Sequence, residues 1–292
     1  MTVGIGDDAA VLEPSDARLV WTVDTAVEGV HFRRDWMSLE DIGWKSLAAA
    51  ASDLGAMGAS PRGVLSSLIL PPEFDDADLV ALARGQAEAA ASLGTAVIGG
   101  NLAGGTQLSV TTTVLGEARE PILRSGARAG DTVALAGPVG LAAAGLELFR
   151  RGAATGGDPA VEALRRPIAR ITAGLAAAGH AHAGIDISDG LALDASRVAA
   201  ASGVGIAFER GALLAAAGSH LAAAAARLAR DPLELALYGG DDYALLMTFA
   251  PGDVPAPFAA VGQCTAEPGI HLREADGSAR LLEPRGFDHF AR

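Results

Sequence analysis

Aspartates that stand beside glycine or other small residues, where an apolar stretch ends, are the residues of this chain best suited to chemistry. A strand end aims a side chain, and a neighbouring glycine lets a ligand or another backbone come close. Partly buried carboxylates repel one another unless cations lie between them, and Mg²⁺ prefers oxygen ligands and bridges carboxylates to phosphates. One such aspartate is more often a helix cap or a turn former, but the repeated setting predicts a cation site. The aspartates are Asp7 and Asp8 in GIGDDAAVL, Asp24 in WTVDTAVEGVHF, Asp53 in AASDLGAMGAS, Asp186 and Asp189 in IDISDG, and Asp241 and Asp242 in YGGDDYALL.

The phosphate-binding motifs of the common nucleotide-hydrolysing enzymes and of protein kinases are missing. The sequence contains no GxxxxGK[ST], HRD or DFG string. Its only lysine, Lys45, stands in GWKSLAAAASD, away from any glycine-rich loop. If the protein handles a triphosphate, metal ions and arginines must neutralise it. That is sufficient, because phosphoryl transfer depends mainly on positioning and charge stabilisation.

The composition narrows the class of protein. With 292 residues, of which 50% are hydrophobic, the chain can bury a sizeable core in one large domain or two ordinary ones. The formal net charge of −13 and the lack of any Lys or Arg run argue against a nucleic-acid partner. Cys264 is the single cysteine, so an intramolecular disulfide and a cysteine-based metal cluster are excluded, and we expect it in the core.

Neither a membrane span nor a secretion signal is apparent in the sequence. No apolar run reaches the roughly 20 residues that cross a bilayer. The opening MTVGIGDDAAVL lacks the basic segment followed by an apolar one that marks a signal peptide. We therefore expect no membrane partner and a cytoplasmic location.

The apolar periodicity predicts two α/β segments joined by a loop. Residues 118–130 combine turn residues with charge, so we place a boundary there, between domains of residues 1–120 and 121–292. We predict strands at 18–24, 63–70, 107–117, 132–137 and 183–187, helices at 39–58, 75–93, 139–151, 159–178 and from 190, and short strands with loops toward the end.

Taken in order, these motifs resemble those of the thiamine-monophosphate kinase family, whose superfamily includes aminoimidazole ribonucleotide synthetase and selenophosphate synthetase. The resemblance runs from Gly4 to Phe290. It rests on GIGDDAAVL, VDTAVEGVHF, SDLGAMGASP, IGGN, LRSGARAGD, IDISDGL, GGDDYAL and the terminal GFDHF. The resemblance implies an α/β (α+β) protein with a two-domain PurM-like fold, each domain a mixed sheet packed with helices, which is usually a homodimer. The implied reaction is ATP- and Mg²⁺-dependent phosphorylation of thiamine monophosphate to thiamine diphosphate, by direct in-line transfer without a covalent nucleophile on the enzyme.

The resemblance also implies roles for individual residues. Val23 has no side-chain oxygen and could offer a metal only its carbonyl, beside Thr22 and Asp24. The implied metal ligands are Asp8, Thr22, Val23, Asp24, Asp53, Asn101, Asp186 and Asp189. The implied ATP contacts are Gly100, Asn101, Arg124 and Ser188, and the implied substrate contacts are His31, Asp241 and Phe287.

Ordinary structural explanations remain open for several of these residues. His31 could be a satisfied structural histidine, Arg124 a surface residue and Phe287 part of the core. An aromatic face at Phe287 would alternatively attract a cationic thiazolium ring. We expect Tyr243 to serve in packing and Asp194, like Asp35, to be a solvated surface charge.

Three departures from the family pattern leave other functions open. GGN at 99–101 replaces GGD, Asp241 is shorter than the usual glutamate, and the chain starts almost at GIGDD, where relatives begin earlier. One alternative is a related ATP-dependent synthetase acting on another small substrate. Another is a homologue that binds nucleotide or thiamine phosphate but is catalytically impaired.

Overall fold

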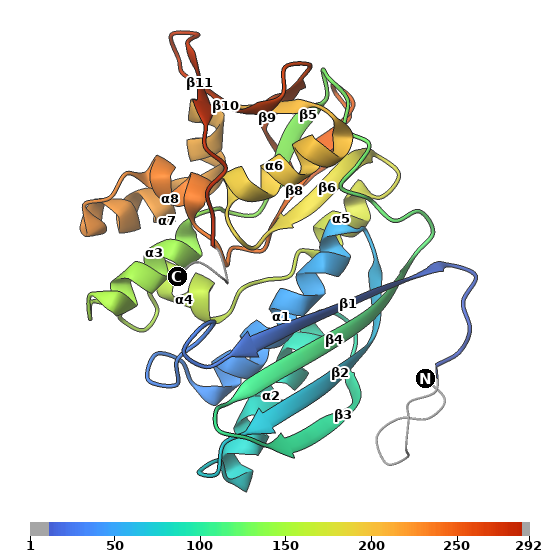
Figure 1. Ribbon diagram of the computed structural model, residues 1–292, viewed down its shortest axis with the longest axis vertical. Helices are drawn as coiled ribbons and strands as arrows, with labels where there is room; N and C mark the ends of the chain where they lie inside the picture. The colour runs from blue at the N-terminus through green and yellow to red at the C-terminus, as the bar shows by residue number, and fades with distance from the viewer. Residues whose placement is uncertain (1–11, 288–292) are drawn as a thin grey trace.

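Two β-sheets organise the molecule, which is described here from a computed structural model covering residues 12–287 (Figure 1). The first sheet has four strands and the second has seven. The boundary that we place at residue 120 falls in the loop between them and stays a proposal. In chain order the elements are β1 (Arg18–Val27), α1 (Leu39–Ala56), β2 (Ser60–Leu70), α2 (Asp76–Ser92), β3 (Val97–Gly104), β4 (Ser109–Ala118), β5 (Thr132–Ala136), α3 (Leu141–Arg150), α4 (Pro159–Arg165), α5 (Ile171–Ala177), β6 (Ala181–Ile187), α6 (Leu191–Ser202), β7 (Gly205–Glu209), α7 (Arg210–Leu228), α8 (Pro232–Tyr238), β8 (Ala244–Phe249), β9 (Ala259–Thr265), β10 (Gly269–Arg273) and β11 (Ala279–Leu282).

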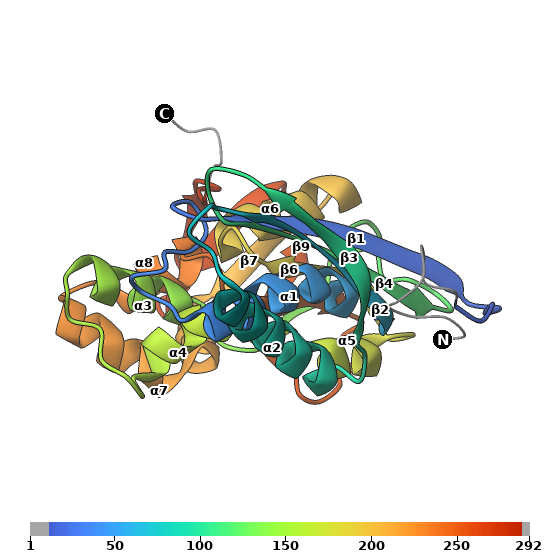
Figure 2. The ribbon, with the colours of Figure 1, turned by 90° about the horizontal axis from the view of Figure 1, so that it is seen from below.

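The four-stranded sheet has the strand order β1-β4-β2-β3 and is covered on one face by α1 and α2 (Figure 2). Strands β1, β4 and β2 pair antiparallel, whereas β2 and β3 pair parallel. A parallel pair needs a crossover connection, which α2 supplies. Leu47, Leu54, Val64 and Val114 form part of the core between this sheet and α1.

The opposite face of this sheet exposes apolar side chains. Side chains along β1 alternate between the two faces of the sheet: Val20 is buried, while Leu19 and Trp21 are each about two-thirds exposed. Leu65 and Ile69, both on β2, are exposed as well. Exposed apolar side chains therefore occur on two strands of this face.

The seven-stranded sheet has the order β11-β10-β7-β9-β5-β8-β6 and is covered on both faces. One face packs against α3, α6, α7 and α8, through residues such as Leu135, Ile185 and Leu246. The other face packs against α5 and the end of α1, through residues such as Ala134 and Met247.

Helix α1 lies between the two sheets, so it positions residues that face both. Ser38 caps its first turn by accepting a hydrogen bond from the Asp41 N–H. Small residues let its neighbours approach closely. A Cβ at Gly43 would stand 2.1 Å from the carbonyl oxygen of Leu82 on α2, so glycine is required there.

The structure corrects two expectations from the sequence. The single helix predicted at 159–178 is wrong: α4 and α5 are separate, because Pro167 lacks an N–H and disfavours helical geometry in the residue before it. The predicted mixture of short strands and loops toward the end also missed α7 and α8.

Helix α7 is, within residues 12–287, the one helix long and apolar enough to cross a membrane by length and composition alone. Its backbone is interrupted at Gly218, which has a φ of 85°. Leu213, Leu221 and Leu228 from both halves are buried in the core of the second sheet. These observations describe a core helix with a kink.

Candidate active site

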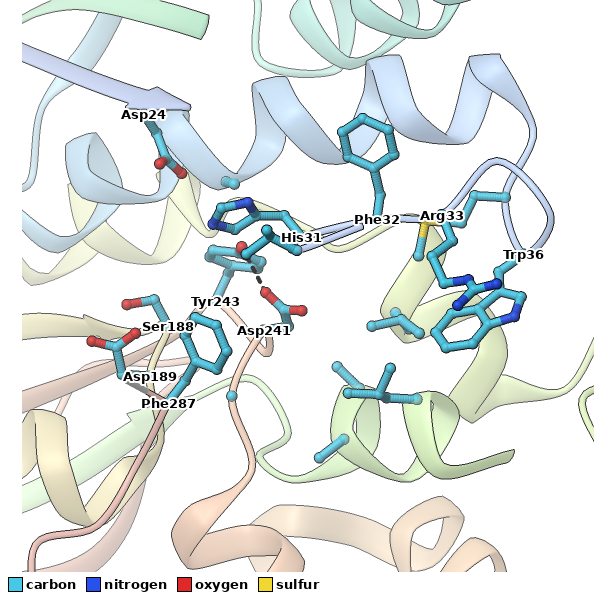
Figure 3. Close-up of a pocket in the computed structure, with 18 of the residues that line it drawn as sticks. Asp24, His31, Phe32, Arg33, Trp36, Ser188, Asp189, Asp241, Tyr243 and Phe287 are labelled. Carbon is cyan, nitrogen blue, oxygen red and sulfur yellow. Dashed lines mark hydrogen bonds between the residues drawn. The ribbon is translucent and has the colours of Figure 1, made fainter. Parts of the chain in front are cut away.

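A cavity of about 710 Å³ opens between the first sheet, α1, α3 and the end of the second sheet (Figure 3). Its size suits a small-molecule ligand. Figure 3 shows Asp24 and Asp189 on one side of His31, and Arg33 and Trp36 on the other. The cavity therefore has an acidic end and an aromatic end.

The acidic end collects carboxylates from three different elements. Asp24 comes from β1, Asp53 from α1 and Asp186 from the end of β6, with Asp189 in the following loop. Ser188 and Val23 also line the cavity. Residues far apart in the sequence thus meet because α1 packs against both β1 and the edge strand β6.

Electrostatics at this end favour a cation. Burial, together with the charge of Asp53, raises the pKa of Asp186 to about 7. Burial also raises the pKa of Asp53, with the charge of Asp24 adding to the effect while Thr22 and Arg124 oppose it. Negative charge therefore exceeds positive charge among these described side chains, as at a site that gains a cation with its ligand.

The loop after β6 is shaped by Asp194, in the first turn of α6. Its Oδ2 accepts hydrogen bonds of 3.1 Å from the N–H groups of Ser188, Asp189 and Gly190. Arg197 donates to Asp194 and, at 2.7 Å, to Asp189. The expectation of a solvated Asp194 is wrong, since the residue is fully buried. The sequence does contain a signal for this role, because Asp194 stands four residues after Gly190 of the SDG motif, in the first turn of the following helix.

The second aspartate loop, at the start of β8, is held by other partners. Asp241 and Tyr243 have left-handed φ angles of 66° and 50°, which non-glycine residues rarely adopt. The Asp241 carboxylate accepts hydrogen bonds from Lys45 at 2.9 Å and from the Tyr243 hydroxyl at 3.0 Å. Tyr243 is buried, as its expected packing role predicts, but its hydroxyl also binds Asp241, which lines the cavity.

Asp242, next in this loop, turns away and binds the start of α3. It accepts hydrogen bonds from the N–H groups of Gly140 and Ala142. Burial raises the pKa of Asp242 to about 7, although the two N–H groups oppose the shift. The carboxylate satisfies N–H groups that have no partner within the helix.

His31 and Phe287 both line the cavity. The Val27 N–H donates to His31 Nδ1 at 3.0 Å, so the neutral ring carries its proton on Nε2. The Phe287 N–H donates to the Asp189 carbonyl at 2.9 Å, which attaches the end of the described chain to the acidic loop. Phe287 is 47% exposed, so a role in the core does not describe it.

The aromatic end was not identified from the sequence. Trp36 stacks on Phe149 with ring centroids 5.4 Å apart, and the Arg33 guanidinium lies 4.7 Å from the Trp36 ring centre. Met37 and Leu146 complete an apolar wall. The basic and aromatic run HFRRDWM could have indicated a binding surface. It does not indicate that α3 lines the other side of the cavity at this end.

Gly100 and Asn101 are not brought to the cavity. Strand pairing places Asp24 opposite Thr112, Thr112 opposite Ser66, and Ser66 opposite Gly100. Three strand spacings therefore separate β1 from β3, which is about 14 Å. The expected contact of Gly100 and Asn101 with ATP phosphates stays a prediction.

Two other expected residues border the acidic end without lining the cavity. The Thr22 hydroxyl donates to Asp53. Arg124 is exposed, and its charge lowers the pKa of Asp53, which places it near that carboxylate. Asp8 lies outside the described residues.

The donor set fits Mg²⁺ bound jointly with phosphate. Among residues 12–287, no three acidic, cysteine or histidine side chains converge on one point as a ready-made metal cage. Mg²⁺ does not need such a cage, because it is usually bound by one or two carboxylates together with phosphate oxygens and waters. Asp53 and the buried Asp186, both oxygen donors without a lysine partner, meet that requirement.

Comparison with known proteins agrees with this architecture. The AIR synthase related protein N-terminal domain matches residues 6–118, and the corresponding C-terminal domain matches residues 128–266. The fold is thus that of an AIR synthase related protein, and the predicted fold class, two mixed sheets packed with helices, is confirmed.

Closer relatives narrow the assignment. The thiamine-monophosphate kinase of Mycobacterium tuberculosis is 39% identical over 286 residues, which cover 96% of this chain and 81% of that protein. AaThiL complexed with AMPPCP and TMP superposes with a TM-score of 0.87 and 32% identity, covering 98% of this chain and 92% of that chain. The thiamine-monophosphate kinase of Stenotrophomonas maltophilia K279a gives a TM-score of 0.85 and 35% identity, covering 95% and 92%. The chain belongs to the thiamine-monophosphate kinase family, a family of phosphotransferases.

Proposed function

We propose that this protein transfers the γ-phosphoryl group of ATP to thiamine monophosphate, giving thiamine diphosphate and ADP, and that it requires Mg²⁺. The observation that carries the proposal is the two-ended cavity. Carboxylates at one end suit metal-bound phosphates, and the apolar and aromatic side chains along the rest of the cavity suit the organic part of a small substrate. Family membership and the relative that binds an ATP analogue with TMP support it.

Mg²⁺ would be held mainly by Asp24, Asp53, Asp186 and Asp189. Oxygens from Thr22, Val23 and Asp8 are the further proposed ligands at this end, whereas Asn101, three strand spacings away, would have to hold a separate ion. When bound, the metal neutralises phosphate charge and lets two anions approach each other. Asp194 and Arg197 keep the loop that carries Ser188 and Asp189 in place for this task.

Transfer is direct and in line. An oxygen of the acceptor phosphate forms the new bond to the γ-phosphorus as the bond to the ADP oxygen breaks, so no enzyme-bound intermediate forms. The acceptor is already an anion and needs no strong base. His31 is the proposed contact of the acceptor phosphate, while Arg124, Ser188, Gly100 and Asn101 are the proposed ATP contacts.

The organic end of the substrate is matched by Asp241 and the aromatic residues. In thiamine monophosphate the exocyclic amine on the pyrimidine is the only N–H donor. Asp241 is a fixed acceptor in the cavity, and so suits that amine. The Phe287 ring suits the cationic thiazolium.

A substrate panel tests this function. The protein is incubated with ATP and Mg²⁺, together with thiamine monophosphate, thiamine or formylglycinamidine ribonucleotide, the precursor of aminoimidazole ribonucleotide. ADP and thiamine diphosphate are then measured by chromatography. We expect thiamine diphosphate with thiamine monophosphate only, and none after Mg²⁺ is chelated. Turnover with the ribonucleotide instead would indicate a related synthetase. Tight binding of thiamine monophosphate without turnover would indicate an impaired homologue.

We also propose that two copies associate through the exposed face of the four-stranded sheet, and that the enzyme is cytoplasmic. The apolar side chains Leu19, Trp21 and Leu65 on that face support a homodimer, because a closed pair would remove them from water. Trp21→Glu should shift the mass in solution, measured by light scattering, from dimer to monomer. A monomeric wild-type protein would contradict this proposal.

A further inference from the structure

Lys45, the only lysine in the chain, is buried in the middle of α1 between the two sheets. Its side chain is 6% exposed. Its ammonium group donates to the Leu164 carbonyl at 3.2 Å and to the Asp241 carboxylate at 2.9 Å. A buried ammonium is costly unless it is paired, so these partners determine its orientation.

Asp241 is held from several directions in a strained conformation. Its N–H donates to the Ser188 carbonyl at 2.8 Å, which fixes its backbone to the acidic loop. Lys45 holds one carboxylate oxygen and the Tyr243 hydroxyl holds the other. A left-handed φ in a non-glycine residue persists only where its surroundings determine it, and such residues gather at functional sites.

We propose that Lys45, assisted by Tyr243, is a positioning residue that keeps Asp241 as a fixed, charge-compensated hydrogen-bond acceptor for the organic end of the substrate. The inference rests on the proposed function and deepens it. Burial and then the charges of Asp241 and Asp24 raise the pKa of Tyr243, so these carboxylates lie in one electrostatic neighbourhood. Without Lys45, Asp241 would add a further uncompensated charge beside the metal-binding end. With Lys45, it can accept a hydrogen bond from an amine without competing for Mg²⁺.

A purely structural role for Lys45 makes a different prediction. Leu164 is in the last turn of α4, where carbonyl groups lack helical partners, so Lys45 also joins α1 to α4. Arg166 provides a matched control, because it links the end of α4 to Asp41 on α1 at 2.7 Å and does not line the cavity. If Lys45, like Arg166, only joins α1 to α4, substituting it should change the melting temperature and leave the KM values unchanged.

The test is a double-mutant cycle on the full-length protein. Lys45→Met, Tyr243→Phe, Asp241→Asn, the combinations Lys45→Met/Asp241→Asn and Tyr243→Phe/Asp241→Asn, and Arg166→Gln are compared with the wild type. The melting temperature and the KM values for thiamine monophosphate and ATP are measured. We expect Lys45→Met and Asp241→Asn each to raise the KM for thiamine monophosphate about 10-fold, and Tyr243→Phe to raise it by a smaller factor. The KM for ATP should stay within about twofold of wild type in every variant, since the altered contacts are at the acceptor end.

The combined variants decide between the two roles. If Lys45 acts through Asp241, each double variant has a KM close to that of Asp241→Asn alone. Arg166→Gln should lower the melting temperature and leave both KM values unchanged. Effects that multiply fully in the double variants, or a lower melting temperature with unchanged KM, would overturn the proposal. If Lys45→Met does not fold, Lys45→Gln, which keeps a hydrogen-bond donor but removes the charge, replaces it in the cycle.

Crystal structures of the wild type and of Tyr243→Phe or Lys45→Met separate this inference from the proposed function. A displaced Asp241 carboxylate in the variant is expected, and an unmoved one would overturn the positioning role whatever the substrate is. A wild-type protein inactive on thiamine monophosphate would reject the proposed function, while the crystallographic comparison would still judge Lys45.

Discussion

Two aspartate loops lie side by side at one edge of the second sheet and are held in opposite ways. β6 runs into Asp186 and Asp189, and its antiparallel neighbour β8 follows directly after Asp241 and Asp242. Burial and the charge of Asp53 raise the pKa of Asp186 to about 7. Asp241, by contrast, is paired with the buried ammonium of Lys45.

The difference shows how one cavity can treat similar carboxylates differently. A carboxylate that has no cation beside it is stabilised most when a ligand brings a metal ion. A carboxylate that is already paired with a lysine can still accept hydrogen bonds, but a metal ion stabilises it little further. We therefore assign the first loop, through Asp186, to metal-bound phosphate and the second, through Asp241, to the organic end of the acceptor. Asp189, also in the first loop, is already paired with Arg197, so the contrast is between Asp186 and Asp241.

Removing a charge from the first loop should have the largest effect. Asp186→Asn should lower kcat about 100-fold or more, because it removes a ligand to a cation at the transferring phosphate. Asp53→Asn should act similarly, and both should raise the Mg²⁺ concentration needed for half-maximal rate. Steady-state rates across a Mg²⁺ titration measure this.

The same two variants should fold normally. The melting temperature without metal should not fall, since an unpaired buried carboxylate is replaced by a neutral amide. Asp276→Asn, at an exposed turn, is the control that should change neither rate nor Mg²⁺ requirement. If Asp186→Asn and Asp53→Asn kept near-normal rates at limiting Mg²⁺, the proposal that the first loop binds the metal and the second does not would be wrong.

Truncation at the acceptor side should affect substrate binding instead. His31→Ala and Phe287→Ala should raise the KM for thiamine monophosphate roughly 5- to 150-fold, since one charge-assisted or stacking contact contributes about 1–3 kcal/mol. The KM for ATP should remain nearly unchanged. A purely structural role would appear as a lower melting temperature with both KM values intact, and an effect confined to ATP would place these residues at the wrong end.

Loosening the first loop without removing a cavity carboxylate should have an intermediate effect. Asp194→Asn weakens the acceptor of three backbone N–H groups, so we expect kcat about 10-fold lower and the free energy of unfolding reduced by about 1–3 kcal/mol. Asp231→Asn changes the cap of α8, away from the cavity, and should affect stability only. If Asp194→Asn also affected stability alone, the loop would not depend on this carboxylate for function.

The smallest effect concerns Asp242 and depends on pH. Its pKa is raised to about 7 by burial, so the neutral form stabilises the fold, and this stabilisation is lost as the pH rises through 7. Relative to wild type, Asp242→Asn should therefore gain roughly 1–3 kcal/mol of stability between pH 5 and pH 8, since one pKa unit corresponds to about 1.4 kcal/mol. Chemical denaturation at several pH values measures the difference. A difference between the two proteins that is independent of pH would show that Asp242 does not titrate in this range.

Local patterns in the sequence predicted much of the fold. Periodicity located α1 within two residues of its observed end, and the acidic pair before α2 marked its start, where Asp75 is the cap. Pro167 carried the signal for the break between α4 and α5, but the alanine-rich helical pattern on both sides obscured it.

The candidate site was only partly predictable, because some roles depend on packing between distant elements. Asp24, Asp53 and Asp186 stand in recognisable local settings, so their types and neighbours identified them. Lys45 looks like an ordinary exposed helix residue until α1 is placed between the two sheets. Asp194 likewise looks like a surface charge until the loop before α6 folds back over it.

The most direct test of the division between the two loops is a crystal structure of the wild-type protein with Mn²⁺, AMPPCP and thiamine monophosphate. Anomalous scattering would locate the metal ions. We expect manganese peaks beside Asp53 and Asp186, none beside Asp241, and the pyrimidine amine within hydrogen-bonding distance of Asp241. A manganese ion bound to Asp241, or metal sites away from the first loop, would contradict it.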